Sequence, residues 1–133
     1  MRRRPPSRGL RLAGLLAALT GLLWLAGCAA AGRTPPPEVP DGNPASGRLA
    51  IERYGCGTCH AIPGVRGADG TVGPPLDRFG LRGYIAGKLP NNGPNLIRWV
   101  QHPQQVEPGT DMPDAGVSEV DARDIAAYLF TLD

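Results

Sequence analysis

Apolar positions divide the chain into an amino-terminal hydrophobic run and a later region in which they recur at helical spacing. The run extends from Leu12 to Ala26. Beyond it, Asn43 followed by Pro44 is typical of a helix start, because an Asn side chain caps the first turn and Pro fits the first helical position. We predict a helix from this point to Gly55, which delivers the chain to residues 56–60.

Three further helices are predicted in the carboxyl-terminal half. A short helix runs from Leu81 to Lys88, and a longer one starts near Asn92 and ends before Pro103. Ser118 caps the last helix, with Asp121 reaching back toward it as in a capping box. The last helix has one apolar stripe, formed by Ile125, Tyr128, Leu129 and Leu132.

Residues 61–76 are rich in Gly and Pro and predict an irregular loop. We find no segment typical of a β-strand and no internal repeat, so the pattern indicates an all-α domain of few helices and long loops. About 90 residues are left for this domain beyond the amino-terminal segments, which is near the lower limit for a core of side chains alone. A large apolar cofactor would supply the buried apolar surface that so few side chains cannot provide.

The amino-terminal segment has the pattern of an export signal. Five arginines precede the apolar run, and the sequence Leu25-Ala26-Gly27-Cys28 closes it. This ending resembles the lipobox of bacterial lipoproteins, in which the Cys becomes the amino terminus and is lipidated. We therefore predict a signal peptide over residues 1–27, a lipidated Cys28 with a Pro-rich linker over residues 28–44, and a folded domain over residues 45–133.

Two other interpretations of this segment remain open. About 20 apolar residues can span a bilayer, so the run is also compatible with an uncleaved transmembrane anchor. Ordinary cleavage nearby would instead leave Cys28 as a free thiol. Lipidation and the helical anchor give the same topology, because the arginines stay in the cytoplasm and the rest is exported. We expect the domain on the periplasmic side of the bacterial cytoplasmic membrane.

Removal of the leader changes the charge of the protein. The whole chain has a formal charge of +2, but five of its 14 basic residues precede the apolar run. Nine basic and 12 acidic residues then remain from Cys28 onward, so the mature chain is mildly acidic. No basic patch is left that would predict nucleic-acid binding.

The residues Cys56-Gly57-Thr58-Cys59-His60 form the C-x-x-C-H sequence that attaches a c-type haem. Two thiols on one turn can each bond a vinyl group of the same porphyrin, and the next side chain then points at the iron. A thioredoxin-type pair would follow a strand of an α/β fold, and zinc would need a second Cys or His pair. A structural disulfide leaves His60 without a role. We predict one covalent haem c, attached through Cys56 and Cys59, with His60 on its iron.

The second axial ligand has few candidates. Met112 is the one methionine left after the leader, and it lies in the polar, Pro-bounded segment 108–113, where a core methionine would be unusual. His102 is the one other histidine, and an open iron position is the third alternative. We predict Met112, since a His and Met pair also gives the higher potential of an electron-transfer site.

With these residues in place, the region from Asp41 to Leu132 resembles the class I cytochromes c, which are small monohaem electron carriers. The resemblance rests on the order of four motifs, namely CGTCH at 56–60, VGPPL at 72–76, WVQHPQQVEPGTDMP at 99–113 and DIAAYL at 124–129. It implies the class I cytochrome c fold, in which few helices and long loops wrap around one covalently bound haem.

The resemblance also implies roles for residues beside the haem. Pro74 would offer its carbonyl oxygen to the outer nitrogen of His60, with a simple turn proline as the alternative. Trp99 would approach Met112, and its indole is a candidate hydrogen-bond donor to that ligand or to a haem propionate. Core packing is the alternative for Trp99.

Other residues are implied at the edge of the haem and between the helices. Tyr84 and Arg82 are candidates for contact with a propionate, with a surface position as the alternative. Gly47 and Ile51 on the first helix would meet Tyr128 on the last helix, in the crossed helix contact typical of the family.

The leading functional hypothesis is a single-electron carrier in the bacterial periplasm, anchored to the membrane by its lipid. Its partners would be an oxidase, a quinol-oxidising complex or a periplasmic dehydrogenase. The alternative is a haem subunit of a periplasmic dehydrogenase or terminal oxidase complex. A gas-binding or peroxidatic enzyme would need an open iron position, against which Met112 argues. Lys88 is the one lysine, so the basic docking ring of mitochondrial carriers is absent and their partners are not implied.

Overall fold

The computed structural model describes residues 38–133, so the predicted signal peptide, Cys28 and most of the linker lie outside the described residues. The order of elements is α2 (Pro44–Arg53), the 3-10 turns η2 (Cys56–Thr58) and η3 (Phe79–Leu81), β1 (Tyr84–Ile85), β2 (Leu89–Pro90), α3 (Gly93–Gln101), α4 (Pro103–Val106) and α5 (Glu119–Leu129). Helices joined by long loops therefore make up most of the described chain, as predicted. None of these helices is long and apolar enough to cross a membrane.

Asn43 and Ser118 cap their helices as predicted, and Asn92 also proves to be a capping residue. The side chain of Asn43 accepts hydrogen bonds from two backbone amides of α2, and that of Asn92 accepts one from α3. Ser118 Oγ accepts a 3.2 Å hydrogen bond from the amide of Asp121 in α5. The second bond of the predicted capping box differs. The Asp121 carboxylate accepts a 2.8 Å hydrogen bond from the Ser118 hydroxyl, and not from the Ser118 backbone amide.

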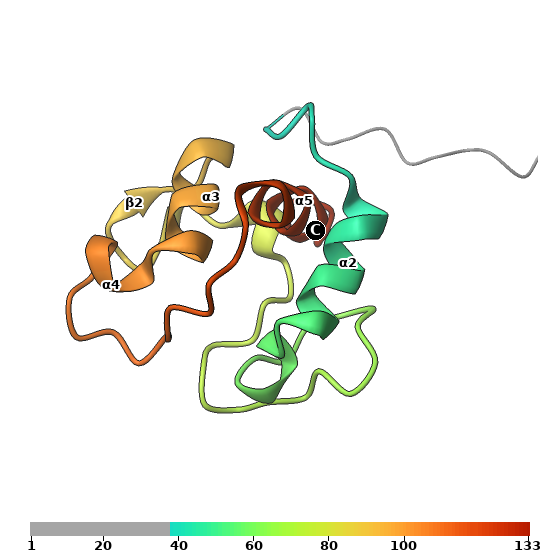
Figure 1. The fold of residues 1–133 in the computed structure, drawn as a ribbon, viewed down its shortest axis with the longest axis horizontal. Helices are drawn as coiled ribbons and strands as arrows, with labels where there is room; N and C mark the ends of the chain where they lie inside the picture. Colours follow the sequence, from blue (N-terminus) through green and yellow to red (C-terminus); the bar gives the residue numbers. More distant parts are fainter. Residues whose placement is uncertain (1–37) are drawn as a thin grey trace, which may run out of the picture. The chain divides into compact units, whose positions relative to one another are not determined.

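Helices α2 and α5 cross in direct contact (Figure 1). At the crossing, α2 carries Gly47, and a Cβ atom there would lie 1.9 Å from the carbonyl oxygen of Asp124 on α5. Any larger residue would force the two helices apart. The predicted crossed contact is therefore present, but Gly47 meets Asp124 and Ile125. Tyr128 lies one turn further along α5 and donates a 2.6 Å hydrogen bond to the carbonyl of Pro63.

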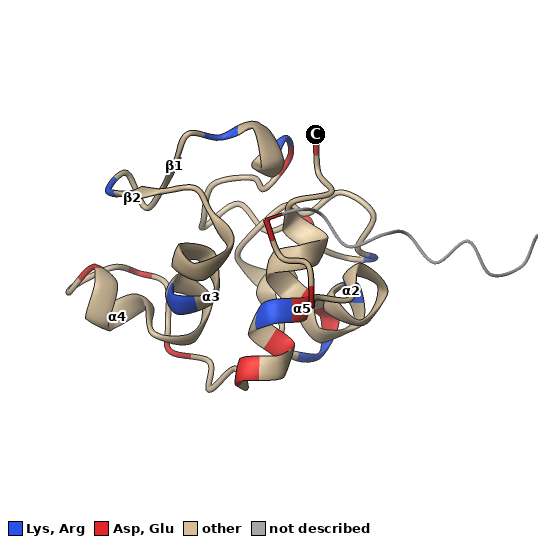
Figure 2. Ribbon diagram, turned by 90° about the horizontal axis from the view of Figure 1, so that it is seen from above, with Lys and Arg blue, Asp and Glu red and all other residues tan. Residues whose placement is uncertain are grey.

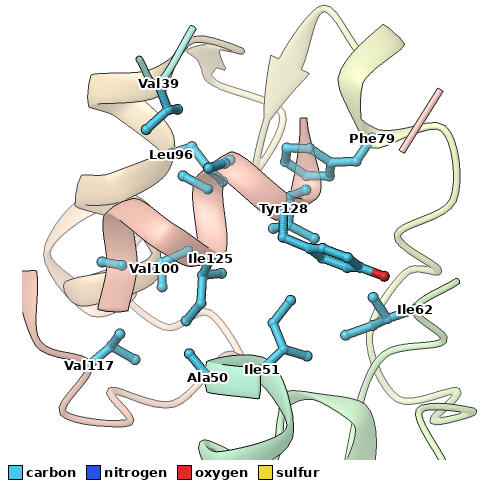
Figure 3. Close-up of a cluster of buried hydrophobic side chains, with 14 of the residues drawn as sticks. Val39, Ala50, Ile51, Ile62, Phe79, Leu96, Val100, Val117, Ile125 and Tyr128 are labelled. Atoms are coloured by element: carbon cyan, nitrogen blue, oxygen red, sulfur yellow. The ribbon is translucent and has the colours of Figure 1, made fainter. Parts of the chain in front are cut away.

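The apolar core gathers around α5, between α2 and α3. Ile51 of α2 and Ile125 of α5 are almost fully buried, at 1% and 2% exposure. Figure 3 shows their side chains on facing sides of this cluster. The predicted stripe of the last helix is buried at Ile125, Tyr128 and Leu129, whereas Leu132 lies beyond the end of α5 and is half-buried.

The predicted helix from Leu81 to Lys88 is wrong, and so is the expectation of no strands. Within the described residues the chain leaves η3 and forms the antiparallel hairpin β1–β2, in which Ile85 pairs with Leu89. Ala86 and Gly87 take φ angles of +50° and +70° at its tip. Such left-handed angles turn the chain back on itself and are incompatible with a continuing α-helix.

Candidate haem site

A cavity of about 480 Å³ opens among α2, the loops and α3, and it is lined by both cysteines of the C-x-x-C-H sequence. His60 and Met112 line it as well. The fold thus brings Met112 to the same cavity as Cys56, Cys59 and His60, although more than 50 positions separate it from them along the chain. Its remaining wall is largely apolar, with Ile51, Leu96, Val100, Ile125 and Leu129 among the lining residues.

The end of α2 places the attachment sequence at the cavity. Gly55 adopts a φ of +70°, which stops the helix and redirects the chain into η2. The carbonyl of Cys56 then accepts hydrogen bonds from the amides of Cys59, at 3.2 Å, and of His60, at 3.0 Å. This tight turn keeps the two thiols and the imidazole together on one side of the chain.

The imidazole of His60 is oriented by the loop that follows. Its Nδ1 atom lies 2.7 Å from the carbonyl oxygen of Pro74, so the contact implied by the resemblance is present. This hydrogen bond sets Nδ1 as the protonated nitrogen and leaves Nε2 as the ring nitrogen available to a metal.

Gly73 makes that arrangement possible, and the sequence reasoning gave this residue no role. A Cβ atom on Gly73 would lie 2.3 Å from Cε1 of the His60 ring. The Gly73 amide also donates a 2.8 Å hydrogen bond to the carbonyl of Cys59, which pulls the loop against the attachment turn. Its position directly before Pro74 was the one feature of the sequence that could have indicated this role.

Of the two side chains proposed as the second ligand, Met112 lines the cavity and His102 does not. His102 is exposed, and its Nδ1 lies 3.9 Å from a carboxylate oxygen of Asp114. Met112 is half-buried on the irregular segment that joins α4 to α5 (Figure 1). The geometry therefore favours Met112 over His102.

Trp99, Arg82 and Tyr84 also line the cavity. The Trp99 indole makes no hydrogen bond to another described residue, so neither the hydrogen bond to Met112 nor the one to a propionate is tested. The Arg82 guanidinium donates to the backbone carbonyls of Pro75 and Asp77, the second at 3.0 Å. Arg82 thus stabilises the loop that carries Pro74 through these hydrogen bonds, a role that the sequence did not indicate.

Burial controls the thiol chemistry of the site. The pKa of the Cys56 thiol is raised, chiefly because the apolar wall disfavours the thiolate; a backbone hydrogen bond opposes the rise and neighbouring Cys59 adds to it. Cys56 is therefore a neutral thiol at neutral pH, and neither cysteine is in a disulfide.

Basic and acidic residues are intermixed over α2 and α5, with no basic cluster among the described residues (Figure 2).

The residues present fit a c-type haem. Two free thiols lie on one turn, a histidine with one engaged nitrogen follows them, and a thioether faces the same apolar cavity. A flat apolar ligand with one polar edge matches a wall of this composition, as in other cofactor sites. The structural observations therefore agree with the cofactor that the C-x-x-C-H sequence predicts.

Two proteins similar to this chain are both cytochrome c oxidase subunit 2. The protein of Alkalihalophilus pseudofirmus is 40% identical over 87 residues, which cover 65% of this chain and 25% of that protein. The protein of Bacillus sp. strain PS3 is 40% identical over 65 residues, or 47% of this chain and 18% of that protein. The chain thus spans at most a quarter of the length of these relatives. No solved structure matches the chain significantly.

The family model for cytochrome c matches residues 45–133, which include the attachment turn, the residues that line the cavity and, apart from Pro44, the four α-helices that the structure describes. The cytochrome c family has a covalently bound haem c with its iron, and Cys56 and Cys59 are in position to attach it. The chain belongs to the cytochrome c family, as a monohaem protein of class I.

Proposed function

We propose that this chain is a periplasmic single-electron carrier in which His60 and Met112 are the axial ligands of the haem iron. The observation that carries the proposal is that both side chains, and both attachment thiols, line one apolar cavity. A haem held by these residues would supply one-electron redox chemistry. No acid, base or nucleophile from the chain is required.

The protein's own contribution is to fix the positions of the two proposed iron ligands, His60 and Met112. Pro74 fixes the imidazole plane of His60 through the 2.7 Å hydrogen bond, and Arg82 holds the loop around Pro74. The apolar wall excludes water, so little solvent has to reorganise when the charge of the site changes. A closed site with two fixed ligands suits electron transfer better than the binding of a small gas.

We further propose that Cys28 is lipidated and holds the domain at the periplasmic face of the cytoplasmic membrane. The support is the sequence pattern alone, with the arginine-rich start and the Leu-Ala-Gly-Cys ending. The proline-rich sequence that follows Cys28 favours an extended chain of roughly 3 Å per residue. The tether would end before Val39, which packs in the folded core. Such a tether raises the local concentration of the domain near membrane partners.

The partner that we favour is a terminal oxidase. The likeness of the domain to part of cytochrome c oxidase subunit 2 in two bacteria supports this choice. The same observation favours a second candidate, in which the chain is a permanent haem subunit of an oxidase complex. Quinol-oxidising complexes and periplasmic dehydrogenases remain the proposed electron donors.

The test is the visible spectrum of the purified, haem-loaded full chain in both redox states. We expect the weak red absorption band that a methionine sulfur produces on ferric iron, and no binding of carbon monoxide to the reduced protein. Absence of the band together with ready carbon monoxide binding would contradict the carrier function. Co-purification of oxidase subunits in mild detergent would favour the permanent subunit, whereas a chain isolated alone favours the mobile carrier.

A further inference from the structure

The segment that carries Met112 is held almost entirely by side chains. Between Asp111 and Val117, the described structure has no hydrogen bond that joins two backbone groups. This segment has no helix or strand to fix it, although a metal ligand must be held to within a fraction of an ångström. Its position must therefore come from side-chain contacts.

Gln104 on α4 provides the largest set of these contacts. Its Nε2 donates hydrogen bonds to the carbonyl oxygens of Thr110, at 2.7 Å, and of Met112, at 3.0 Å. Its Oε1 accepts a 3.3 Å hydrogen bond from the amide of Gly109. Both ends of the amide are thus in use, and a flipped amide would place oxygen against two carbonyl oxygens.

The backbone of Met112 is held on both sides as a result. Its carbonyl accepts from Gln104, and its amide donates to the Thr110 hydroxyl at 3.3 Å. Before this segment, Glu107 at the end of α4 forms an ion pair with Lys88 of the β1–β2 hairpin. The Gln104 contacts are the ones that reach the ligand residue itself.

We propose that Gln104 is a positioning residue for the sulfur of Met112, acting from outside the cavity to keep the iron closed to other ligands. The proposal rests on the proposed function, because it takes Met112 as the second axial ligand. Gln104 is exposed and does not line the cavity, so its loss leaves the haem wall unchanged.

The experiment measures the affinity of the ferric, haem-loaded full chain for imidazole, a probe that must displace the methionine sulfur. Gln104→Ala removes all three contacts, and Gln104→Glu keeps the acceptor but loses both donors and sets a negative charge against two carbonyl oxygens. We expect imidazole to bind about tenfold more tightly to both variants, as loss of about 1.4 kcal/mol of hydrogen bonding gives. The red methionine band should weaken in parallel.

Gln105 supplies a matched control. It is the next residue of α4, it is also exposed, and its side chain makes no hydrogen bond to any other described residue. Gln105→Ala should bind imidazole as the parent protein does. A merely structural role of Gln104 would lower the unfolding temperature without changing the band or the imidazole affinity.

Two results would overturn the inference. If the parent protein shows the methionine band and both Gln104 variants match it in band and in imidazole affinity, the positioning role is wrong and the ligation by Met112 stands. If the parent protein itself lacks the band, the proposed ligation and the positioning role fail together.

Discussion

The hydroxyl of Tyr54, at the end of α2, donates a 2.8 Å hydrogen bond to Oδ2 of Asp121, in the first turn of α5. The same carboxylate accepts from Ser118 and pairs with Arg53 across the helix crossing. Tyr54 lines the haem cavity, so this junction ties the helix that leads to the attachment turn to the carboxyl-terminal helix.

These partners lower the pKa of the Asp121 carboxyl, with the Tyr54 hydrogen bond contributing most, followed by that of Ser118. A group whose pKa is lower in the folded protein stabilises the fold above its unfolded pKa, and that stabilisation is lost as the pH falls. We expect Asp121→Asn to lower the denaturant midpoint at pH 7, with a difference that shrinks below about pH 4.

The measurement is denaturant unfolding of both proteins between pH 7 and pH 3. Glu119→Gln is the control, because Glu119 pairs with Arg123 within α5 and reaches no other helix. A constant difference between parent and Asp121→Asn across this range would contradict the role of the ionised carboxylate.

Met112→Ala removes the proposed second ligand. We expect the red methionine band to disappear, the reduced protein to bind carbon monoxide, and the reduction potential to fall, because the thioether favours ferrous iron. Optical redox titration and carbon monoxide binding measure these changes. His102→Ala should leave all three properties unaltered. A parent protein that lacks the band, and whose spectrum changes in His102→Ala but not in Met112→Ala, would reverse the ligand assignment.

Gly73→Ala places a Cβ atom where the His60 ring lies, at 2.3 Å from Cε1. The ring or the loop must shift, which strains the Pro74 contact. We expect the haem-loaded variant to be less stable by about 1–3 kcal/mol, the usual range for an overpacked site. Denaturant unfolding followed at the Soret band measures this loss.

Gly83→Ala is the matched control for that variant, because a Cβ atom on Gly83 meets no atom within 4 Å and its φ is not left-handed. Equal stabilities of the two alanine variants would show that the close approach at Gly73 is not required.

Cys28→Ser tests the anchor. If Cys28 carries the lipid, the variant should move the haem protein from the membrane fraction to the soluble fraction, or leave an uncleaved precursor. Fractionation with mass spectrometry of the intact chain distinguishes these forms. A variant that stays in the membrane, and whose mass differs from that of the parent protein only by the exchange of sulfur for oxygen, would favour the uncleaved helical anchor over lipidation.

Most of the helical organisation followed from local sequence. Asn43, Asn92 and Ser118 begin α2, α3 and α5 as predicted, because capping depends on residues within one turn. The hairpin was missed for the opposite reason. Apolar residues at 81, 85 and 89 have helical spacing, and the left-handed Ala86 and Gly87 become evident only once Ile85 pairs with Leu89.

By itself, the sequence determined the chemistry of attachment and its order along the chain, because C-x-x-C-H holds two thiols and an imidazole on a single turn. Only the tertiary structure decided how the ligands are held. The approach of Gly73 to His60 and the reach of Gln104 to Met112 each depend on loops that have no periodic pattern. Such contacts depend on how these loops fold back on themselves in space, and no periodic pattern in the sequence indicates that course.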